Sequence, residues 1–279
     1  MRCINNVNLL LFLFTLLNER TITQHFQQTA NASVDEIRCK MKLTDQEYER
    51  LFPAHFDKFV FPTSGGCAGL GNQMFRFAAL YGIGKPYGRK PIYKESQKCT
   101  THDHGTEGGR EKEMLFPVFA RQEKYFNPAG KQNQIFYIKN GFIGCFAYED
   151  PQKFAISRIK QKYLEMDGEA CLQSYKYFES RRTEIRQIFQ FGHQLCRTVM
   201  AFKKELFGND QTHKFCVHTR TGDIVRFGWG SKKDFTEKGI EFGFEYLRKK
   251  FGNISISVVL LGEEKQFLAN LSFNRQANF

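Results

Sequence analysis

The stretch Phe215-Cys216-Val217-His218-Thr219-Arg220-Thr221-Gly222-Asp223 decides the fold. Its apolar first part predicts a short buried strand that ends near Arg220, and glycine with aspartate then predicts a turn. An amphipathic helix is expected over 235–251, a second apolar strand over 256–261 and a last helix over 263–271. This order of strand, helix, strand and helix predicts half of a Rossmann-like unit with a parallel sheet. Since it holds only two strands, the unit is expected to be incomplete.

The rest of the chain predicts a larger α/β domain upstream. We expect four segments: a leader over 1–17, a stem and first helix over 18–54, an α/β domain over 55–208 and the partial Rossmann-like domain over 209–279. The further elements are expected as helices over 35–52, 72–83, 182–191 and 194–207, and as strands over 56–61, 90–93, 135–138 and 142–147.

The N-terminus predicts export. Met1-Arg2 precedes an apolar run over 9–17, which is far shorter than the roughly 20 residues of a membrane span. It fits a secretory signal peptide or a short signal anchor. Three Asn-X-Ser sequons would place glycans on Asn31, Asn253 and Asn270. Of the eight cysteines one lies in the leader, and the other seven are expected to include disulfides and at least one thiol that stays free or pairs between chains.

The net charge of the chain limits the classes of binding partner that we expect. A net charge of +12 fits nucleic acid, an anionic membrane or an anionic small substrate. The lysines and arginines are scattered and form no basic arm, so we expect no nucleic-acid partner. His102-Asp103-His104 lies in a polar, glycine-rich stretch that predicts a solvated loop. Since no third ligand is evident there, we expect no metal site.

A first motif, Gly69-Leu70-Gly71-Asn72-Gln73-Met74-Phe75, follows a predicted strand and opens a predicted helix. Glycines in such a place let the backbone approach a ligand, and a helix N-terminus suits anions. The spacing is not that of a dinucleotide-binding fingerprint. A tight turn with Asn72 as helix cap explains the motif equally well, so both interpretations stay open.

The second motif is His218-Thr219-Arg220-Thr221-Gly222-Asp223, at the carboxyl end of the predicted strand, where open α/β sheets bind ligands. The guanidinium of Arg220 matches a phosphate in a bidentate way and would stabilise a departing diphosphate without a metal. A surface ion pair is the alternative for Arg220. For His218, a core histidine bonded to backbone is the more expected role, and Asp223 would accept a proton, hold Arg220 or cap the next segment.

These motifs together resemble those of the α-1,2-fucosyltransferases (a glycosyltransferase family 11-like pattern), in particular divergent nematode members. Gly69 to Phe75 is similar to the N-terminal signature of that family, and His218 to Asp223 is similar to its His-X-Arg-Arg-X-Asp donor motif. The segment over 172–178 and the strand over 258–262 resemble two further stretches. The resemblance runs from about residue 59 to residue 271.

The resemblance implies a GT-B-like fold with two Rossmann-like domains, the second incomplete, and inverting transfer of fucose from GDP-fucose to a galactose-type hydroxyl of a glycan. It implies no cofactor and no metal, and a place in the Golgi lumen or membrane, or secretion if the leader is cleaved. Arg220 and Asp223 would act in catalysis. The residues implied to bind substrate are His218, Thr221, Gly222, Gly69, Gly71, Asn72 and Gln73.

Two departures keep an alternative open. Thr221 stands where the family has its second arginine, and the aromatic-rich last motif of the family does not follow the strand over 256–261. We therefore expect a C-terminally truncated member. The alternative function is that of a non-catalytic or inactive protein that at most binds GDP or a glycan.

Overall fold

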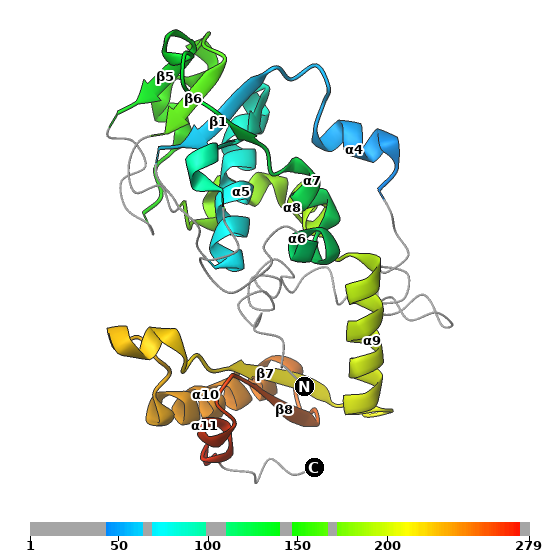
Figure 1. The fold of residues 1–279 in the computed structure, drawn as a ribbon. Helices are drawn as coiled ribbons and strands as arrows, with labels where there is room; N and C mark the ends of the chain where they lie inside the picture. Colours follow the sequence, from blue (N-terminus) through cyan, green and yellow to red (C-terminus); the bar gives the residue numbers. More distant parts are fainter. Residues whose placement is uncertain (1–42, 64–68, 99–109, 140–146, 167–171, 274–279) are drawn as a thin grey trace. The chain divides into compact units, whose positions relative to one another are not determined.

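The computed structural model describes residues 43–63, 69–98, 110–139, 147–166 and 172–273 of the 279-residue chain (Figure 1). The described residues divide into two compact units, a larger one that ends at Lys203 and a smaller one that begins at Lys204. The predicted domain boundary, between 208 and 209, lies five residues beyond this division. Helix α9 (His193–Phe207) contains the division point.

The larger unit is built on a four-stranded parallel sheet in the order β2-β1-β6-β5. Its strands are β1 (Lys58–Pro62), β2 (Arg89–Pro91), β5 (Ile135–Ile138) and β6 (Tyr163–Met166). A second parallel pair joins β3 (Tyr93–Lys94) to β4 (Tyr125–Phe126). Central strands of parallel sheets are covered on both faces, which is why all of β6 is buried.

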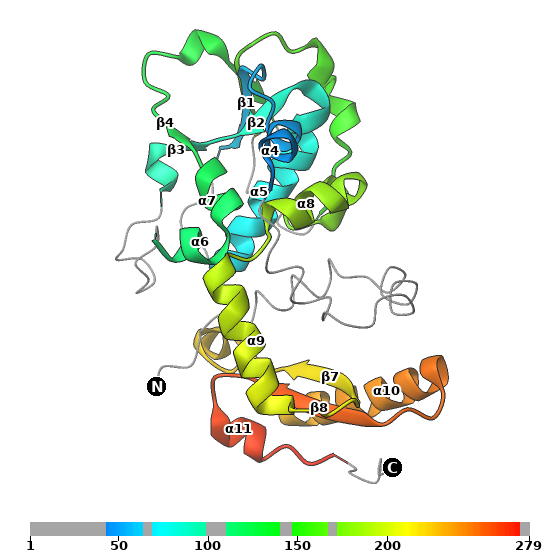
Figure 2. The same cartoon turned by 90° about the vertical axis from the view of Figure 1, so that its right-hand side faces the viewer.

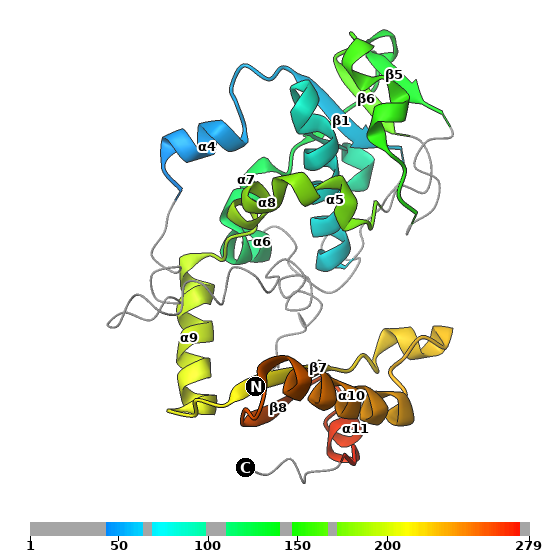
Figure 3. The same cartoon turned by 180° about the vertical axis from the view of Figure 1, so that it is seen from behind.

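Helix α5 (Leu70–Gly84) connects β1 to β2 and is the central helix of this unit (Figures 2 and 3). From Phe77 to Gly84 every residue of α5 is buried. Phe77 meets Phe119 and Phe189 edge-to-face, with ring centroids 5.0 and 6.2 Å apart. The many phenylalanines of this chain therefore build the core through contacts between rings.

Shorter helices complete the larger unit. They are α4 (Asp45–Leu51), α6 (Arg110–Leu115), α7 (Pro117–Gln122) and α8 (Arg182–Ile188). A capping box starts α4: the Thr44 hydroxyl accepts from the Glu47 amide, and the Glu47 carboxylate accepts from the Thr44 amide. The predicted helix over 35–52 is therefore shorter where the structure describes it, since a cap fixes its start at Asp45.

Arg89 is a buried cation at the start of β2, with 2% of its surface exposed. Its guanidinium donates to the carbonyl of Ile159 at 2.8 Å and to that of Gln161 at 3.1 Å. It also reaches the carbonyls of Phe59 at 3.3 Å and Lys162 at 3.4 Å. One side chain thus ties β2, β1 and the segment that leads into β6 together at the amino ends of the strands.

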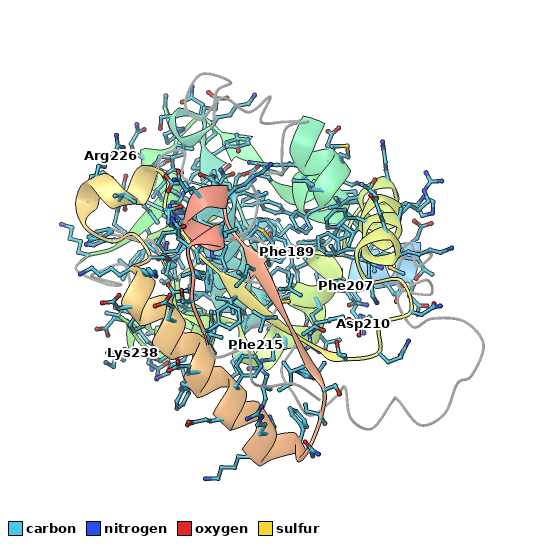
Figure 4. All side chains as sticks on the ribbon, turned by 90° about the horizontal axis from the view of Figure 1, so that it is seen from below. Phe189, Phe207, Asp210, Phe215, Arg226 and Lys238 are labelled. Atoms are coloured by element: carbon cyan, nitrogen blue, oxygen red, sulfur yellow. The ribbon has the colours of Figure 1, made fainter. Side chains whose placement is uncertain are left out.

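The smaller unit contains β7 (His213–His218), α10 (Lys233–Phe251), β8 (Ile256–Leu261) and α11 (Lys265–Ala269). The two strands pair in parallel from His213↔Ile256 to His218↔Leu261. Phe215, labelled in Figure 4, packs against Phe244 of α10 with ring centroids 5.8 Å apart. A Cβ built on Gly243 would lie 2.2 Å from the tip of the Phe215 ring, so this glycine lets α10 approach the strand.

The predicted α/β class, with a Rossmann-like parallel sheet in each unit, is confirmed, and the described residues of the second unit contain two strands, as predicted. The strand over 256–261 has the predicted bounds. The sequence prediction missed β6, and the predicted strand over 142–147 lies outside the described residues except for Ala147, which belongs to no strand. The predicted last helix is shorter, since α11 begins only at Lys265.

Within the described part of the chain, no helix is both long enough and apolar enough to cross a membrane. The leader, Asn31 and His102-Asp103-His104 lie outside the described residues. Cys196 is disulfide-bonded, whereas Cys216 on β7 is a free, half-buried thiol.

Candidate functional site

The loop after β7 is held to its neighbours by backbone hydrogen bonds. The Thr219 amide donates to the carbonyl of Leu261, the last residue of β8, at 2.8 Å. The Arg220 amide donates to the Ser231 hydroxyl at 2.9 Å, and the Ser231 amide donates back to the Arg220 carbonyl at 2.8 Å. Arg220 is exposed. A cation therefore stands on a fixed backbone just past the carboxyl end of a parallel strand, which is the ligand-binding edge of such sheets.

Buried and exposed side chains alternate along this loop, as they do along a strand. Thr219 and Thr221 are buried, with 2% and 7% of their surfaces exposed, and Arg220 between them faces solvent. The Thr221 hydroxyl oxygen is buried and has no hydrogen-bond partner among the described residues. A buried hydroxyl without a partner is uncommon and marks a place where a further polar group is expected.

His218 is half-buried at the end of β7. Burial lowers the pKa of its imidazole, and the positive charge of Arg220 lowers it further, while Glu263 acts in the opposite direction. The ring is therefore neutral at pH 7. Among the described residues it makes no hydrogen bond to backbone, so the expected core role is not what the structure shows.

Two residues near the loop were not predicted as site residues. Ser231 fixes the backbone of Arg220, and Glu263 follows β8. A Cβ built on Gly222 would lie 2.6 Å from the Glu263 carboxylate, so the absence of a side chain at Gly222 makes room for this group. An acidic residue directly after the second strand was the available signal for Glu263. Ser231 carried none, because only the folded chain brings it beside Arg220.

Asp223 starts the short helix η8 (Asp223–Phe227), and its side chain lies outside the described part. Its role thus stays a prediction. Two further acids, Asp234 and Glu237, follow the loop in sequence, and Glu237 accepts a hydrogen bond from the Ser272 amide at 2.5 Å. Asp234 lies in the first turn of α10.

The first motif lies in the larger unit and opens α5. Gly69 is the N-cap of this helix and no side chain caps it, so the expected capping role of Asn72 is wrong. The side-chain oxygen Oδ1 of Asn72 instead accepts from the side-chain amide of Gln173 at 2.8 Å. Gly71 and Gln73 are half-buried in the first turn. The motif is thereby linked to the segment over 172–178, the stretch singled out between the two motifs in the sequence.

That segment packs closely on α5. A Cβ built on Gly82 would lie 2.1 Å from the Tyr177 carbonyl oxygen and 2.9 Å from the Phe178 Cα. Phe178 also contacts Phe75 of α5, with ring centroids 5.9 Å apart. Close packing at Gly82 therefore positions the residues that contact the start of the helix.

Gly82→Ala is expected to destabilise the larger unit by roughly 1–3 kcal/mol, because the obstructing atoms belong to the backbone and move only with the whole segment. Thermal unfolding with hydrogen exchange at residues 172–178 measures this. Gly239→Ala is the control: it also lies inside a helix, and its added Cβ meets nothing within 4 Å. It is expected to leave stability unchanged or slightly higher. Equal loss in both variants would contradict the role of Gly82.

Two of the three predicted glycosylation asparagines fall on described residues. Asn253 and Asn270 are both exposed, the first just after α10 and the second at the end of α11. Both are therefore accessible to a modifying enzyme.

Comparison with known proteins finds relatives in Caenorhabditis elegans. The chain is 25% identical over 223 residues to svh-11, a protein provisionally named as a galactoside 2-α-L-fucosyltransferase; the match covers 76% of this chain and 54% of that one. A galactoside 2-α-L-fucosyltransferase of the same species is 24% identical over 291 residues, which cover 98% and 68% of the two chains. The chain thus spans about half the length of the first of these relatives.

No protein-family profile matches the chain. Among solved structures, it is similar to the fucosyltransferase NodZ from Bradyrhizobium, with a TM-score of 0.42 and 13% identity over 77% of this chain and 75% of that one. The NodZ α-1,6-fucosyltransferase co-crystallized with GDP gives a TM-score of 0.41 and 14% identity over the same shares. The chain is thus similar, at 24–25% identity, to nematode proteins that carry the name galactoside 2-α-L-fucosyltransferase.

Proposed function

We propose that this chain binds GDP-fucose at the carboxyl end of β7 and transfers fucose, with inversion, to a galactose-type hydroxyl of a glycan. The observation that carries the proposal is Arg220, whose backbone Ser231 fixes at the ligand-binding edge of the β7–β8 pair. The names of the curated relatives support the reaction class and the galactoside acceptor.

Charge development in this reaction matches what Arg220 offers. When the bond between fucose and the diphosphate breaks, negative charge grows on the leaving phosphate. A guanidinium in a fixed position stabilises that charge through two parallel hydrogen bonds and needs no metal. A neutral His218 beside it adds no second positive charge to the site. The donor GDP-fucose is thus proposed as a substrate, with no further cofactor.

GDP is expected to bind with the same affinity in excess EDTA and in excess Mn²⁺, because a protein cation replaces the metal. Titration calorimetry measures this, and release of GDP from GDP-fucose in the presence of galactosides measures turnover. Binding that requires Mn²⁺ would contradict the proposal. UDP is the control ligand for base selectivity.

A second function is favoured by one observation. Thr221 supplies no charge and is buried, so the motif has one cation on this loop, whereas the family that it resembles has two. A protein that binds GDP or a glycan without catalysis would show calorimetric binding of GDP and no release of GDP from GDP-fucose. The two assays together therefore distinguish the enzyme from the binding protein.

We also propose a place in the secretory pathway, in the Golgi lumen or membrane or outside the cell. The disulfide at Cys196 fits an oxidising compartment, and the exposed sequons at Asn253 and Asn270 fit one with glycosylation. A shift in electrophoretic mobility on removal of N-glycans from the expressed chain tests this.

A further inference from the structure

Glu263 follows β8 by two residues and lies beside the loop that carries Arg220. The Leu261 carbonyl, at the end of β8, accepts from the Thr219 amide, and the Glu263 carboxylate occupies the space above Gly222. Glu263 is exposed, and among the described residues its carboxylate has no hydrogen bond or ion-pair partner. A hydrogen-bond acceptor is therefore available beside the loop whose fixed backbone carries Arg220.

The residues that follow β7 and β8 are expected to bind different parts of a nucleotide. In a strand-helix-strand nucleotide site, the loop after the first strand holds phosphate, and an acidic residue after the second strand accepts hydrogen bonds from ribose hydroxyls. Here β7, α10 and β8 form such a unit, with Arg220 after the first strand and Glu263 after the second. Neighbouring strands lie about 4.8 Å apart, which is comparable to the separation of phosphate and ribose in one nucleotide.

We propose that the Glu263 carboxylate accepts hydrogen bonds from the ribose hydroxyls of the nucleoside diphosphate whose phosphates Arg220 binds. This assignment of Glu263 rests on the proposed donor site. It adds which residue recognises the nucleoside part of the ligand. A carboxylate repels phosphate, so it fixes which end of the ligand faces β8. It also disfavours nucleotides that carry a phosphate on the ribose.

Two ordinary roles for Glu263 make different predictions. It lies near the start of α11, whose N-cap is Glu264, and it interacts electrostatically with His218. The lowered pKa of His218 leaves its ring neutral at pH 7, so an ion pair there contributes little. If Glu263 only supported the fold, its replacement would weaken every ligand by the same factor.

The experiment compares GDP, 2′-deoxy-GDP and 3′-deoxy-GDP on the wild-type chain and on Glu263→Ala, Glu263→Gln and Arg220→Ala. The wild type is expected to bind GDP about 10-fold or more tightly than at least one deoxy analogue, since a hydrogen bond to a charged acceptor is lost. Glu263→Ala is expected to bind all three equally, and Glu263→Gln, which keeps one acceptor oxygen, to be intermediate. Arg220→Ala is expected to weaken all three by one factor and to keep their ratio.

Glu264→Ala is the matched control, because it removes a neighbouring exposed carboxylate and should leave the ratios unchanged. If the wild type binds GDP but does not distinguish the deoxy analogues, the ribose assignment is overturned and the donor site stands. The assignment is likewise overturned if Glu263→Ala keeps the wild-type ratio of affinities for GDP and its deoxy analogues. The ribose assignment is also overturned if the wild type prefers GDP to IDP and Glu263→Ala loses this preference, because Glu263 would then bind the base. If the wild type binds no GDP, the donor site itself fails.

Discussion

Arg220→Ala should lower the affinity for GDP by roughly 10- to 100-fold, and turnover of GDP-fucose by roughly 100- to 1,000-fold. The first loss is that of a charge-assisted, bidentate contact with the diphosphate. The second is larger because the guanidinium is most needed when the leaving phosphate gains charge. The backbone hydrogen bonds with Ser231 do not involve the side chain, so the loop is expected to keep its course in the variant.

Two further variants separate charge from geometry. Arg220→Lys keeps the charge but loses the planar fork, so it should recover part of the affinity and little of the turnover. Arg248→Ala removes an exposed arginine near the end of α10, away from the loop, and should bind GDP as the wild type does. Calorimetry and a GDP-release assay give both quantities. Equal effects of Arg220→Ala and Arg248→Ala would show that only net charge matters.

Arg89→Met should destabilise the larger unit by about 3 kcal/mol or more. The substitution keeps most of the length of the side chain but removes the donors to the Ile159 and Gln161 carbonyls, which lie at the buried amino ends of the sheet. Buried carbonyls that lose their partners carry the full cost of desolvation. We expect faster amide exchange in β1, β2 and β6 together, because the guanidinium ties these strands.

The matched control for Arg89→Met is Arg158→Met. This variant replaces an exposed arginine in the segment that leads to β6. It should unfold as the wild type does, within about 0.5 kcal/mol. Urea unfolding followed by hydrogen exchange measures both. If Arg89→Met leaves exchange in β1 and β6 unchanged, the guanidinium does not hold the sheet together.

The sequence predicted the strand over 256–261 and the helices α5, α9 and α10 well, because long apolar periodicities and glycine turns are local signals. It missed β6, whose short run Tyr163–Met166 contains a glutamate. In the fold this glutamate, Glu165, is buried, and its carboxylate lies 2.6 Å from the ammonium group of the half-buried Lys94. An ion pair between residues 71 positions apart produces no local sequence pattern, so it could not be used to predict β6.

The residues of the candidate site also differ in whether the sequence alone could predict them. Arg220, Thr221 and Gly222 could be found from one contiguous motif, whereas Ser231 and Glu263 approach it only after α10 and β8 are in place. Asn72 was expected as a cap because of its type and position. Gly69 takes the N-cap position, which leaves the side chain of Asn72 to bind Gln173.

The burial of Thr221 limits which side chains this position can hold. With 7% of its surface exposed and its side chain on the inner side of the loop, this position has no room for a long, charged group unless the loop moves away from its neighbours. A Thr221→Arg substitution would therefore disturb the fold before it added a second cation to this loop. A second positive charge at this position would need compensating substitutions around it, so the loop is restricted to the single cation of Arg220.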